Sequence, residues 1–196
     1  TYYKSINRNK KSVVLDLRRE DDRLLARELA RRADVMVENL RPGTMARYGV
    51  GYDDGAHDNR EVVYCSISGF GGQPGGAHLP GYDLLGQAIS GLMSVTGEPG
   101  GAPVKCGVPL CDFTTALYGA FGVAAALRER EQTGKGQYID LSMLGASLAI
   151  AALQTSEYFG TGNNPRKLGS AHPRNAPYQA FQTEDGYFGM AAGNNN

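Results

Sequence analysis

The sequence predicts an α/β fold of the Rossmann-like kind, in which helices flank a parallel sheet. Short runs of apolar and β-branched residues at 12–17, 35–38 and 62–67 are typical of strands, and the first of them alternates in character. Helical segments are predicted between them, one opening at Asp21 and a shorter one at 44–48. Strands that alternate with helices at this spacing favour a parallel, doubly wound sheet.

The two helices between these strands have separate local signals. In the first, Leu24, Leu25 and Leu29 share one face, and Arg and Glu residues occupy the other. The second follows the chain-breaking sequence at 41–43, and Thr44 is its candidate N-cap.

The second half of the chain continues the pattern. We predict a helix at 83–93 capped by Asp83, a helix from Asp112 to about Gln132, a strand at 137–141, a small-residue helix at 143–158, and a hairpin with strands at 178–183 and 187–190. Glycines at 134 and 136 are a plausible stop for the long Asp112 helix, and Glu-Asp-Gly at 184–186 is the expected hairpin turn.

Two loops of this fold are expected to border a ligand site. Doubly wound sheets bind ligands beyond the carboxyl ends of their strands, and the loops there are 38–43 and 68–76. The second loop has too many glycines for a helix or strand, so it is either mobile or tightly folded. Neither it nor the later Gly/Pro loop at 97–107 matches a P-loop or a dinucleotide fingerprint.

Composition excludes several classes of function. The chain has 196 residues, 41% hydrophobic, with 20 basic and 20 acidic side chains, which predicts a soluble globular protein without a nucleic-acid surface or polybasic membrane anchor. The longest apolar stretches, at 116–127 and 141–153, are expected to fall short of a bilayer span. Three cysteines without CxxC or Cys/His ligand spacing predict free thiols, a cytoplasmic location and no metal site.

Asp112 is the residue that decides the function. It ends the segment that begins at Lys105, and an apolar run from Phe113 to Leu127 follows at once. A carboxylate at a helix start can accept hydrogen bonds from the free N–H groups of the first turn, and the helix dipole favours its ionised form. The same position suits a nucleophile that is held in place. The residues alone leave both interpretations open.

Two polar segments also have two interpretations. Residues 7–12 put two Asn and three cationic side chains before a predicted strand, which makes either a solvated charged turn or a contact for phosphate. Residues 38–43 form either a plain turn or a site in which Asn39 and Arg41 bind a ligand with polar and anionic parts. No Ser or Cys has a clear His partner, so a hydrolase triad is not supported.

Several motifs stand in a fixed order along the chain. They are Ser5-Ile-Asn-Arg-Asn-Lys-Lys-Ser12, Ala33-Asp-Val-Met-Val-Glu-Asn-Leu-Arg-Pro-Gly43, Ser66-Ile-Ser-Gly-Phe-Gly71, Gly81-Tyr-Asp83, Val108-Pro-Leu-Cys-Asp112 and Thr133-Gly-Lys-Gly-Gln137. Together they closely resemble the class III coenzyme A transferases (the CaiB/BaiF type), a family that includes formyl-CoA and carnitine CoA transferases and the α-methylacyl-CoA racemases. The resemblance covers nearly all of the chain.

The resemblance implies that Asp112 is the catalytic nucleophile of a CoA-transferase. Its carboxylate would attack the thioester carbonyl of an acyl-CoA donor and form a mixed anhydride with release of the CoA thiolate. A carboxylic acid acceptor would then exchange in and be joined to CoA. The substrates implied are therefore coenzyme A esters and carboxylic acids, without a metal.

The resemblance also implies which residues contact CoA. They are Leu15, Asp16, Asn39, Leu40, Arg41, Arg47, Gly81, Tyr82 and Asp83. Among them Arg41 and Arg47 are expected to bind the CoA phosphates, and residues 81–83 are expected to line the thioester end. Some relatives have lysines where this chain has Ser68 and Pro80.

Tyr82 favours transfer over the alternative reaction of the family. Racemase relatives place His at this position, where it works with the Asp as an acid/base pair that moves the α-proton. An unperturbed Tyr titrates about three pH units above His and is a poorer proton shuttle at neutral pH. The alternatives to a transferase are an α-methylacyl-CoA racemase that uses Asp112 as acid/base and, further removed, a non-catalytic CoA-binding protein.

The chain is expected to be a portion of a larger protein, incomplete at both ends. Residues 1–160 would form the large CoA-binding and catalytic α/β domain without its first strand–helix unit. Residues 161–196 would form a linker and the start of a smaller domain. The resemblance also implies an interlocked homodimer.

Overall fold

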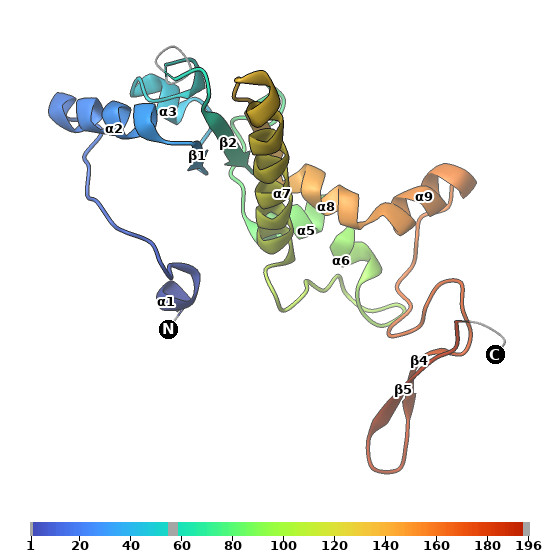
Figure 1. Cartoon of the computed structure of the whole chain (residues 1–196). Helices are drawn as coiled ribbons and strands as arrows, with labels where there is room; N and C mark the ends of the chain where they lie inside the picture. Colours follow the sequence, from blue (N-terminus) through green and yellow to red (C-terminus); the bar gives the residue numbers. More distant parts are fainter. Residues whose placement is uncertain (1, 55–58, 194–196) are drawn as a thin grey trace.

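The computed structural model describes residues 2–54 and 59–193, and its centre is a parallel three-stranded sheet (Figure 1). The strands β1 (Val35–Glu38), β2 (Val63–Ser68) and β3 (Tyr138–Ser142) lie in the order β1-β2-β3. The first pair runs from Val35 opposite Val63 to Glu38 opposite Ser66, and the second from Tyr64 opposite Tyr138 to Ser68 opposite Ser142. The predicted α/β fold with a parallel sheet is confirmed.

Helix α7 (Leu110–Thr133) packs against β2 and β3. Gly119 allows this close approach, because a Cβ there would lie 3.2 Å from the Leu141 side chain. At Gly122 a Cβ would make an ordinary contact with Ile139 at 3.7 Å. The helix ends at Gly134, whose φ of 66° is the left-handed conformation of a C-cap glycine, close to the predicted end.

By length and composition α7 also qualifies as a membrane-spanning helix. The prediction that no apolar stretch reaches that length is therefore wrong. One side of α7 packs against β2, β3, α5 (Asp83–Ile89) and α8 (Met143–Ile150), as a helix that covers a sheet does in an α/β layer.

The remaining helices are shorter than predicted where the backbone turns. A single helix at 83–93 is replaced by α5 and α6 (Leu92–Val95), because Gly91 between them adopts a φ of 83°. The helix at 143–158 is likewise divided at Ala151 into α8 and α9 (Ala152–Thr161). The helices α2 (Glu20–Arg32) and α3 (Thr44–Arg47) follow the prediction, although the N-cap of α3 is Gly43 and not Thr44. A short helix, α1 (Tyr2–Ile6), precedes them.

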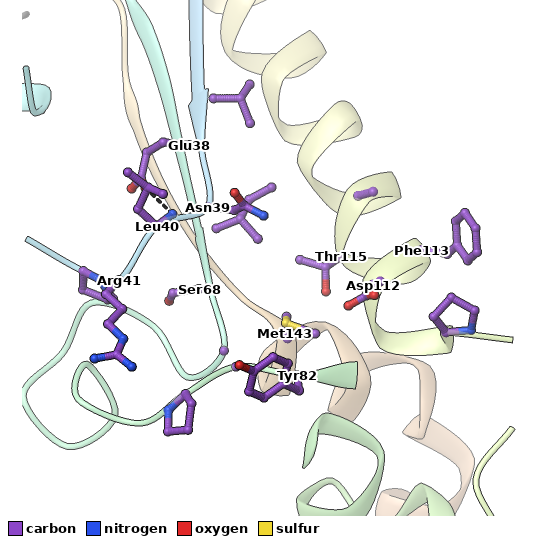
Figure 2. A pocket seen from close by; sticks show the side chains of 18 of the residues that line it. Glu38, Asn39, Leu40, Arg41, Ser68, Tyr82, Asp112, Phe113, Thr115 and Met143 are labelled. Carbon is purple, nitrogen blue, oxygen red and sulfur yellow. Dashed lines mark hydrogen bonds between the residues drawn. The ribbon is translucent and has the colours of Figure 1, made fainter. Parts of the chain in front are cut away.

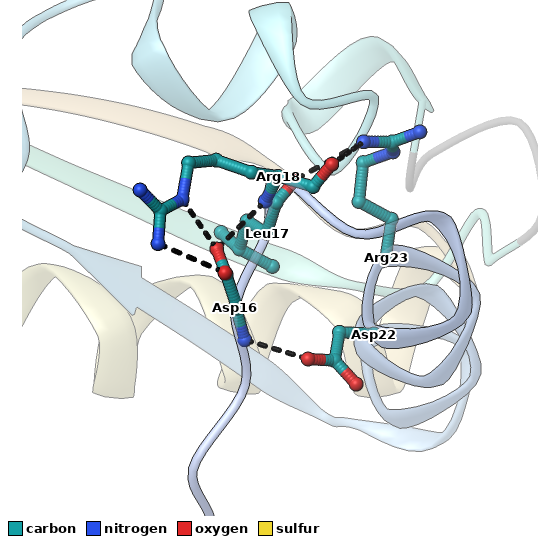
Figure 3. A network of polar contacts seen from close by, with 5 residues as sticks. All are labelled: Asp16, Leu17, Arg18, Asp22 and Arg23. Carbon is teal, nitrogen blue, oxygen red and sulfur yellow. Dashed lines mark hydrogen bonds and ion pairs between the residues drawn. The ribbon is translucent and has the colours of Figure 1, made fainter.

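The predicted strand at 12–17 is wrong. Residues 11–16 have no regular structure, and Val14 is 93% exposed. The backbone N–H of Asp16 donates to the Asp22 side chain at 2.8 Å instead of to a neighbouring strand (Figure 3). A strand needs a partner for its N–H and C=O groups, and within the described ranges this segment pairs with none.

The predicted hairpin is confirmed at the end of the described chain. Strands β4 (Tyr178–Gln182) and β5 (Tyr187–Ala191) pair antiparallel, with the rings of Phe181 and Phe188 stacked at 5.4 Å. Figure 1 shows this hairpin standing away from the parallel sheet. The three cysteines are free, as predicted.

Candidate active site

A pocket of about 690 Å³ lies beyond the carboxyl ends of β1 and β2. Its walls are the turn at 39–42, the segments 67–69 and 79–82, the first turns of α7, and Met143 at the start of α8. Ile6 and Lys10 line it from the N-terminal segment. The pocket therefore lies where a doubly wound sheet places its ligand.

The turn after β1 is tied to the end of β2 by Glu38. One carboxylate oxygen of Glu38 accepts a hydrogen bond from the backbone N–H of Leu40 at 2.8 Å, and the other accepts from the hydroxyl of Ser66. The turn that carries Asn39, Leu40 and Arg41 is thus held by a side chain of the strand before it (Figure 2).

The floor of the pocket depends on a close crossing of two glycines. A Cβ on Gly81 would lie 2.5 Å from the Cα of Gly69, and a Cβ on Gly69 would lie 2.4 Å from the Cα of Gly81. No side chain fits between backbones at this distance. The crossing closes the loop between them and brings Tyr82 beside the end of β2.

The glycine-rich loop at 68–76 is tightly folded. The N–H of Gly71 donates to the Ser68 hydroxyl at 2.9 Å, and the N–H of Gly72 donates to the Asp140 carboxylate at 3.0 Å. Of the two alternatives that the sequence left for this loop, the structure shows the second.

Asp112 lies on the pocket side of α7. Figure 2 shows its carboxylate near Thr115 and facing the region of Met143 and Tyr82, while Phe113, which also lines the pocket, points in a different direction from the helix. The helix begins two residues earlier, with Pro109 as its N-cap, so Asp112 is in the first turn and is not the capping residue. The predicted N-cap at Asp112 is wrong.

The electrostatics of this position also differ from the prediction. Partial burial, followed by the charge of Asp83, raises the pKa of Asp112 above its ordinary value. The helix dipole favours an ionised carboxylate at a first turn, whereas burial and the Asp83 charge both act against ionisation. Ionisation of Asp112 is therefore disfavoured relative to a free aspartate.

Asp83 is the first residue of α5, after the N-cap Tyr82, and its carboxylate points into the contact with α7. It accepts a hydrogen bond from the Cys111 N–H at 2.8 Å and another from the Gln87 amide at 2.7 Å. Asp83 does not line the pocket, although both of its predicted neighbours, Gly81 and Tyr82, do.

Three more of the predicted contact residues, Leu15, Asp16 and Arg47, lie outside the pocket lining. Asp16 is engaged by Arg18, which donates to both of its carboxylate oxygens at 2.8 and 2.9 Å and lowers the pKa of that carboxyl (Figure 3). The guanidinium of Arg47 lies 5.3 Å from the ring centre of Tyr48. Contact with CoA at these positions and at Asp83 stays a prediction.

The structure adds lining residues that were not named individually as CoA contacts from the sequence. Lys10 belongs to the basic segment at 7–12, so its charge was a usable signal. Glu38 was visible at the start of the turn that follows β1. Met143 and Thr115 had no local signal, because only the packing of α7 and α8 brings them to the pocket.

A second hollow, of about 330 Å³, shares Glu38 and Pro42 with the first. Three tyrosines contribute to its wall, namely Tyr52, Tyr64 and Tyr138, with ring centres 5.1 to 5.9 Å apart. Neither pocket contains a metal-binding cluster, since no group of three or more His, Cys, Asp or Glu side chains suited to a metal occurs among the residues that the structure describes.

Comparison with known proteins identifies the family of this chain. A succinate–glutarate CoA-transferase of Agrobacterium fabrum is 41% identical over 98% of this chain and 48% of its own length. An acetyl-CoA:oxalate CoA-transferase of Acetobacter aceti is 41% identical over 100% of this chain and 50% of its own length. The chain thus spans about half the length of the curated relatives it matches.

Solved structures show the same relationship in three dimensions. A CAIB/BAIF family protein from Brucella suis superposes with a TM-score of 0.88 at 41% identity, over 95% of this chain and 50% of that one. The orthorhombic form of Rv3272 from M. tuberculosis gives a TM-score of 0.82 at 33% identity, over 95% of this chain and 48% of that one. The model of CoA-transferase family III matches residues 1–196, and the chain therefore belongs to that family.

Proposed function

We propose that the complete protein moves CoA from an acyl-CoA thioester to a carboxylic acid, with Asp112 as the nucleophile. The observation that carries this proposal is the position of one carboxylate, Asp112, on the wall of a pocket that also holds Asn39 and Arg41. The family supports CoA chemistry, and relatives are named as CoA-transferases for succinate, glutarate and oxalate.

The proposed reaction is an exchange of carboxylates and thiolate on acyl carbons. An oxygen of Asp112 attacks the thioester carbonyl, the C–S bond breaks, and a mixed anhydride forms with release of the CoA thiolate. For the donor acid to leave, the thiolate attacks the Asp112 carbonyl carbon, which expels the donor as a carboxylate. The acceptor carboxylate then displaces the thiolate, and the thiolate attacks the acceptor acyl carbon and frees Asp112. No proton is transferred in the net reaction.

The raised pKa of Asp112 is compatible with this role. A carboxylate that is less stable as an anion is more basic and is therefore a better nucleophile once it is ionised. The same partial burial keeps bulk water away from an anhydride that water would hydrolyse. The tightly folded loop at 68–76 lies beside this pocket and is the proposed shield. Backbone N–H groups near it, other than those of Gly71 and Gly72, are the proposed oxyanion donors.

We assign the anionic part of CoA to the cationic side of the pocket. Arg41 and Lys10 line it, and a guanidinium offers paired donors to a phosphate. Arg47, Leu15 and Asp16 stay candidates for the more distant part of the cofactor. Gly81 and Tyr82 border the region of Asp112 and are assigned to the thioester end.

We also propose that the complete protein is a homodimer, in the interlocked form that its family resemblance implies. Several apolar side chains of α7 are uncovered in the single chain, including Leu117 at 72% and Phe121 at 75% exposure. Apolar faces of this extent are typical of association surfaces. Light scattering of the complete protein tests this directly, and a monomer at working concentration would contradict it.

The activity is tested on the complete protein with succinyl-CoA, acetyl-CoA and a panel of carboxylic acids that includes glutarate and oxalate. We expect new CoA thioesters of at least one acceptor, formed by the wild type and lost in Asp112→Asn. A racemase is tested in the same samples with a 2-methylacyl-CoA in deuterated water. Deuterium at the α-carbon without CoA transfer would replace the proposed reaction by the alternative one.

A further inference from the structure

Gln87 is a fully buried amide whose hydrogen bonds connect α5 to the loop before α7. It is 1% exposed and has the largest volume among the side chains that are fully buried in the described chain. Its Nε2 donates to Asp83 at 2.7 Å, and its Oε1 accepts from the backbone N–H of Cys106 at 2.8 Å. A flipped amide would face the Cys106 N–H with its own donor, so this network fixes the orientation. Burial of an amide is costly unless both its N–H and its carbonyl oxygen have hydrogen-bond partners.

The Asp83 carboxylate extends the network to the first turn of α7. The Cys111 N–H is one of the N–H groups at the helix start that have no partner inside the helix. Pro109, the N-cap, makes no side-chain hydrogen bond to it. Asp83 accepts from Cys111 at 2.8 Å and so caps α7 from a neighbouring helix.

The contact around Cys111 is tight on two sides. A Cβ on Gly86 of α5 would lie 3.0 Å from the Cys111 sulfur, and the Ser147 hydroxyl of α8 donates to that sulfur at 2.9 Å. With Cys111 fixed inward, the next residue is rotated by about 100° around the helix axis. That rotation puts the Asp112 side chain on the pocket side (Figure 2).

We infer that Asp83 and Gln87 are positioning residues for the nucleophile, because they hold the first turn of α7 and the loop before it so that Asp112 faces the pocket. This inference rests on the proposed function of Asp112. Neither residue lines the pocket, so both act through the backbone of Cys106 and Cys111.

The charged and titratable groups around Asp112 influence its ionisation and therefore the pH dependence of kcat/KM. Asp83 is the acidic group that faces it from α5, and Cys111 is its titratable neighbour on α7. Lys10, Glu38, Arg41 and Tyr82 line the same pocket. Removal of the Asp83 charge removes one of the two causes that raise the pKa of Asp112.

The test uses the complete protein with Gln87→Met, Asp83→Asn and the control Ser90→Ala. Met nearly keeps the volume of Gln87 and removes both hydrogen bonds. Ser90 is equally part of the α5 region and is buried, but its hydroxyl donates to the backbone carbonyl of Gln87 and not to the side-chain amide. Asp83→Asn keeps the shape of the side chain and keeps the inference testable where Gln87→Met does not fold.

Two readouts separate positioning from general stability. In Gln87→Met we expect backbone hydrogen exchange at Cys106 to be about tenfold faster, as for the loss of one hydrogen bond. Exchange at Cys111 should also be faster, because Asp83 loses the amide that orients its carboxylate. Because small misplacements cost about 100-fold in rate, we expect kcat to fall by about that factor with KM for the acyl-CoA unchanged. In Asp83→Asn the acid limb of kcat/KM moves to lower pH, and in Ser90→Ala none of these quantities changes.

The inference is overturned if a folded Gln87→Met protein keeps wild-type exchange and wild-type kcat, or if a folded Asp83→Asn protein keeps wild-type exchange at Cys106 and Cys111 together with wild-type kcat. A wild type that transfers no CoA would refute the proposed function separately. The comparison of backbone hydrogen exchange between wild type and variants needs no catalysis, and it then decides whether Asp83 and Gln87 hold the first turn of α7.

Discussion

The carboxylate of Asp83 accepts a hydrogen bond from the backbone N–H of Cys111 at 2.8 Å, across the contact between α5 and α7. This bond places a negative charge beside the residue that precedes Asp112. Together with partial burial, that charge raises the pKa of Asp112. This environment disfavours the ionised form of Asp112, which is the form that reacts, and therefore lowers the stability of the folded protein at neutral pH.

Asp112→Asn is expected to stabilise the protein at neutral pH. A carboxyl with a raised native pKa contributes stability that is fully present below the unfolded value, for which 3.8 is the ordinary figure, and that is lost as the pH rises through the native pKa. An amide never ionises, so the variant avoids this loss. Denaturant unfolding should show a higher midpoint for Asp112→Asn at neutral pH and no gain below pH 3.8.

Asp185→Asn is the matched control for that measurement. Asp185 is exposed in the turn of the hairpin and accepts a hydrogen bond from Thr183. The same amide substitution there should leave the midpoint unchanged at neutral pH. A less stable Asp112→Asn protein at neutral pH would show that the environment favours the charged form of this residue, against our account.

The glycine crossing predicts a strong positional effect in the loop between β2 and α5. In Gly81→Ala the new Cβ would meet the Gly69 backbone at 2.5 Å, so the two segments must separate. We expect a loss of about 1–3 kcal/mol in unfolding free energy, typical of overpacking. CoA binding should weaken as well, because both glycines line the pocket.

Gly75→Ala provides the comparison within the same loop. A Cβ at Gly75 would meet nothing within 4 Å, and its φ lies outside the left-handed region. This variant should have wild-type stability and wild-type CoA affinity by calorimetry. Equal effects of Gly75→Ala and Gly81→Ala would mean that loop entropy, and not the crossing, governs the site.

Arg41 and Arg47 should differ in their contribution to CoA affinity. Arg41 lines the pocket, whereas the Arg47 guanidinium lies over the Tyr48 ring. Loss of one charge-assisted hydrogen bond predicts about a tenfold weaker affinity for Arg41→Ala and a smaller salt dependence of binding. Titration of CoA at two ionic strengths measures both quantities.

The same titration of Arg47→Ala tests the residue that the family resemblance favours and the pocket does not include. We expect a change smaller than that of Arg41→Ala. The reverse order would show that the phosphates extend past α3, outside the pocket of about 690 Å³.

Local pattern was sufficient to predict the sheet and its long helix. The runs that became β1, β2 and β3 are short and β-branched, and α7 ends at Gly134 because a left-handed glycine stops the helix. The segment 12–17 has the same local pattern as a strand but lacks a partner in the described chain, so pattern alone misassigned it. At Gly91 and Ala151 the backbone leaves the helical conformation, and this change depends on tertiary packing that the local pattern does not contain.

The site could be predicted only where motif residues meet at one sheet edge. Asn39, Leu40, Arg41, Gly81, Tyr82 and Asp112 do line one pocket. Asp83 belongs to the same motif as Tyr82, yet its carboxylate turns toward α7, because the helix that starts between them rotates successive side chains apart. Gln87 and Met143 had no sequence signal, since their roles arise from contacts between helices distant in the chain.

Chemical trapping of the acylated enzyme tests the central claim most directly. The complete protein is mixed with its acyl-CoA donor and quenched with hydroxylamine, and the peptide that contains Asp112 is analysed by mass spectrometry. Our account predicts a hydroxamate on Asp112 that appears only with the donor and is absent from Asp112→Asn. An unmodified Asp112 in a protein that transfers CoA, with the activity retained in Asp112→Asn, would contradict it.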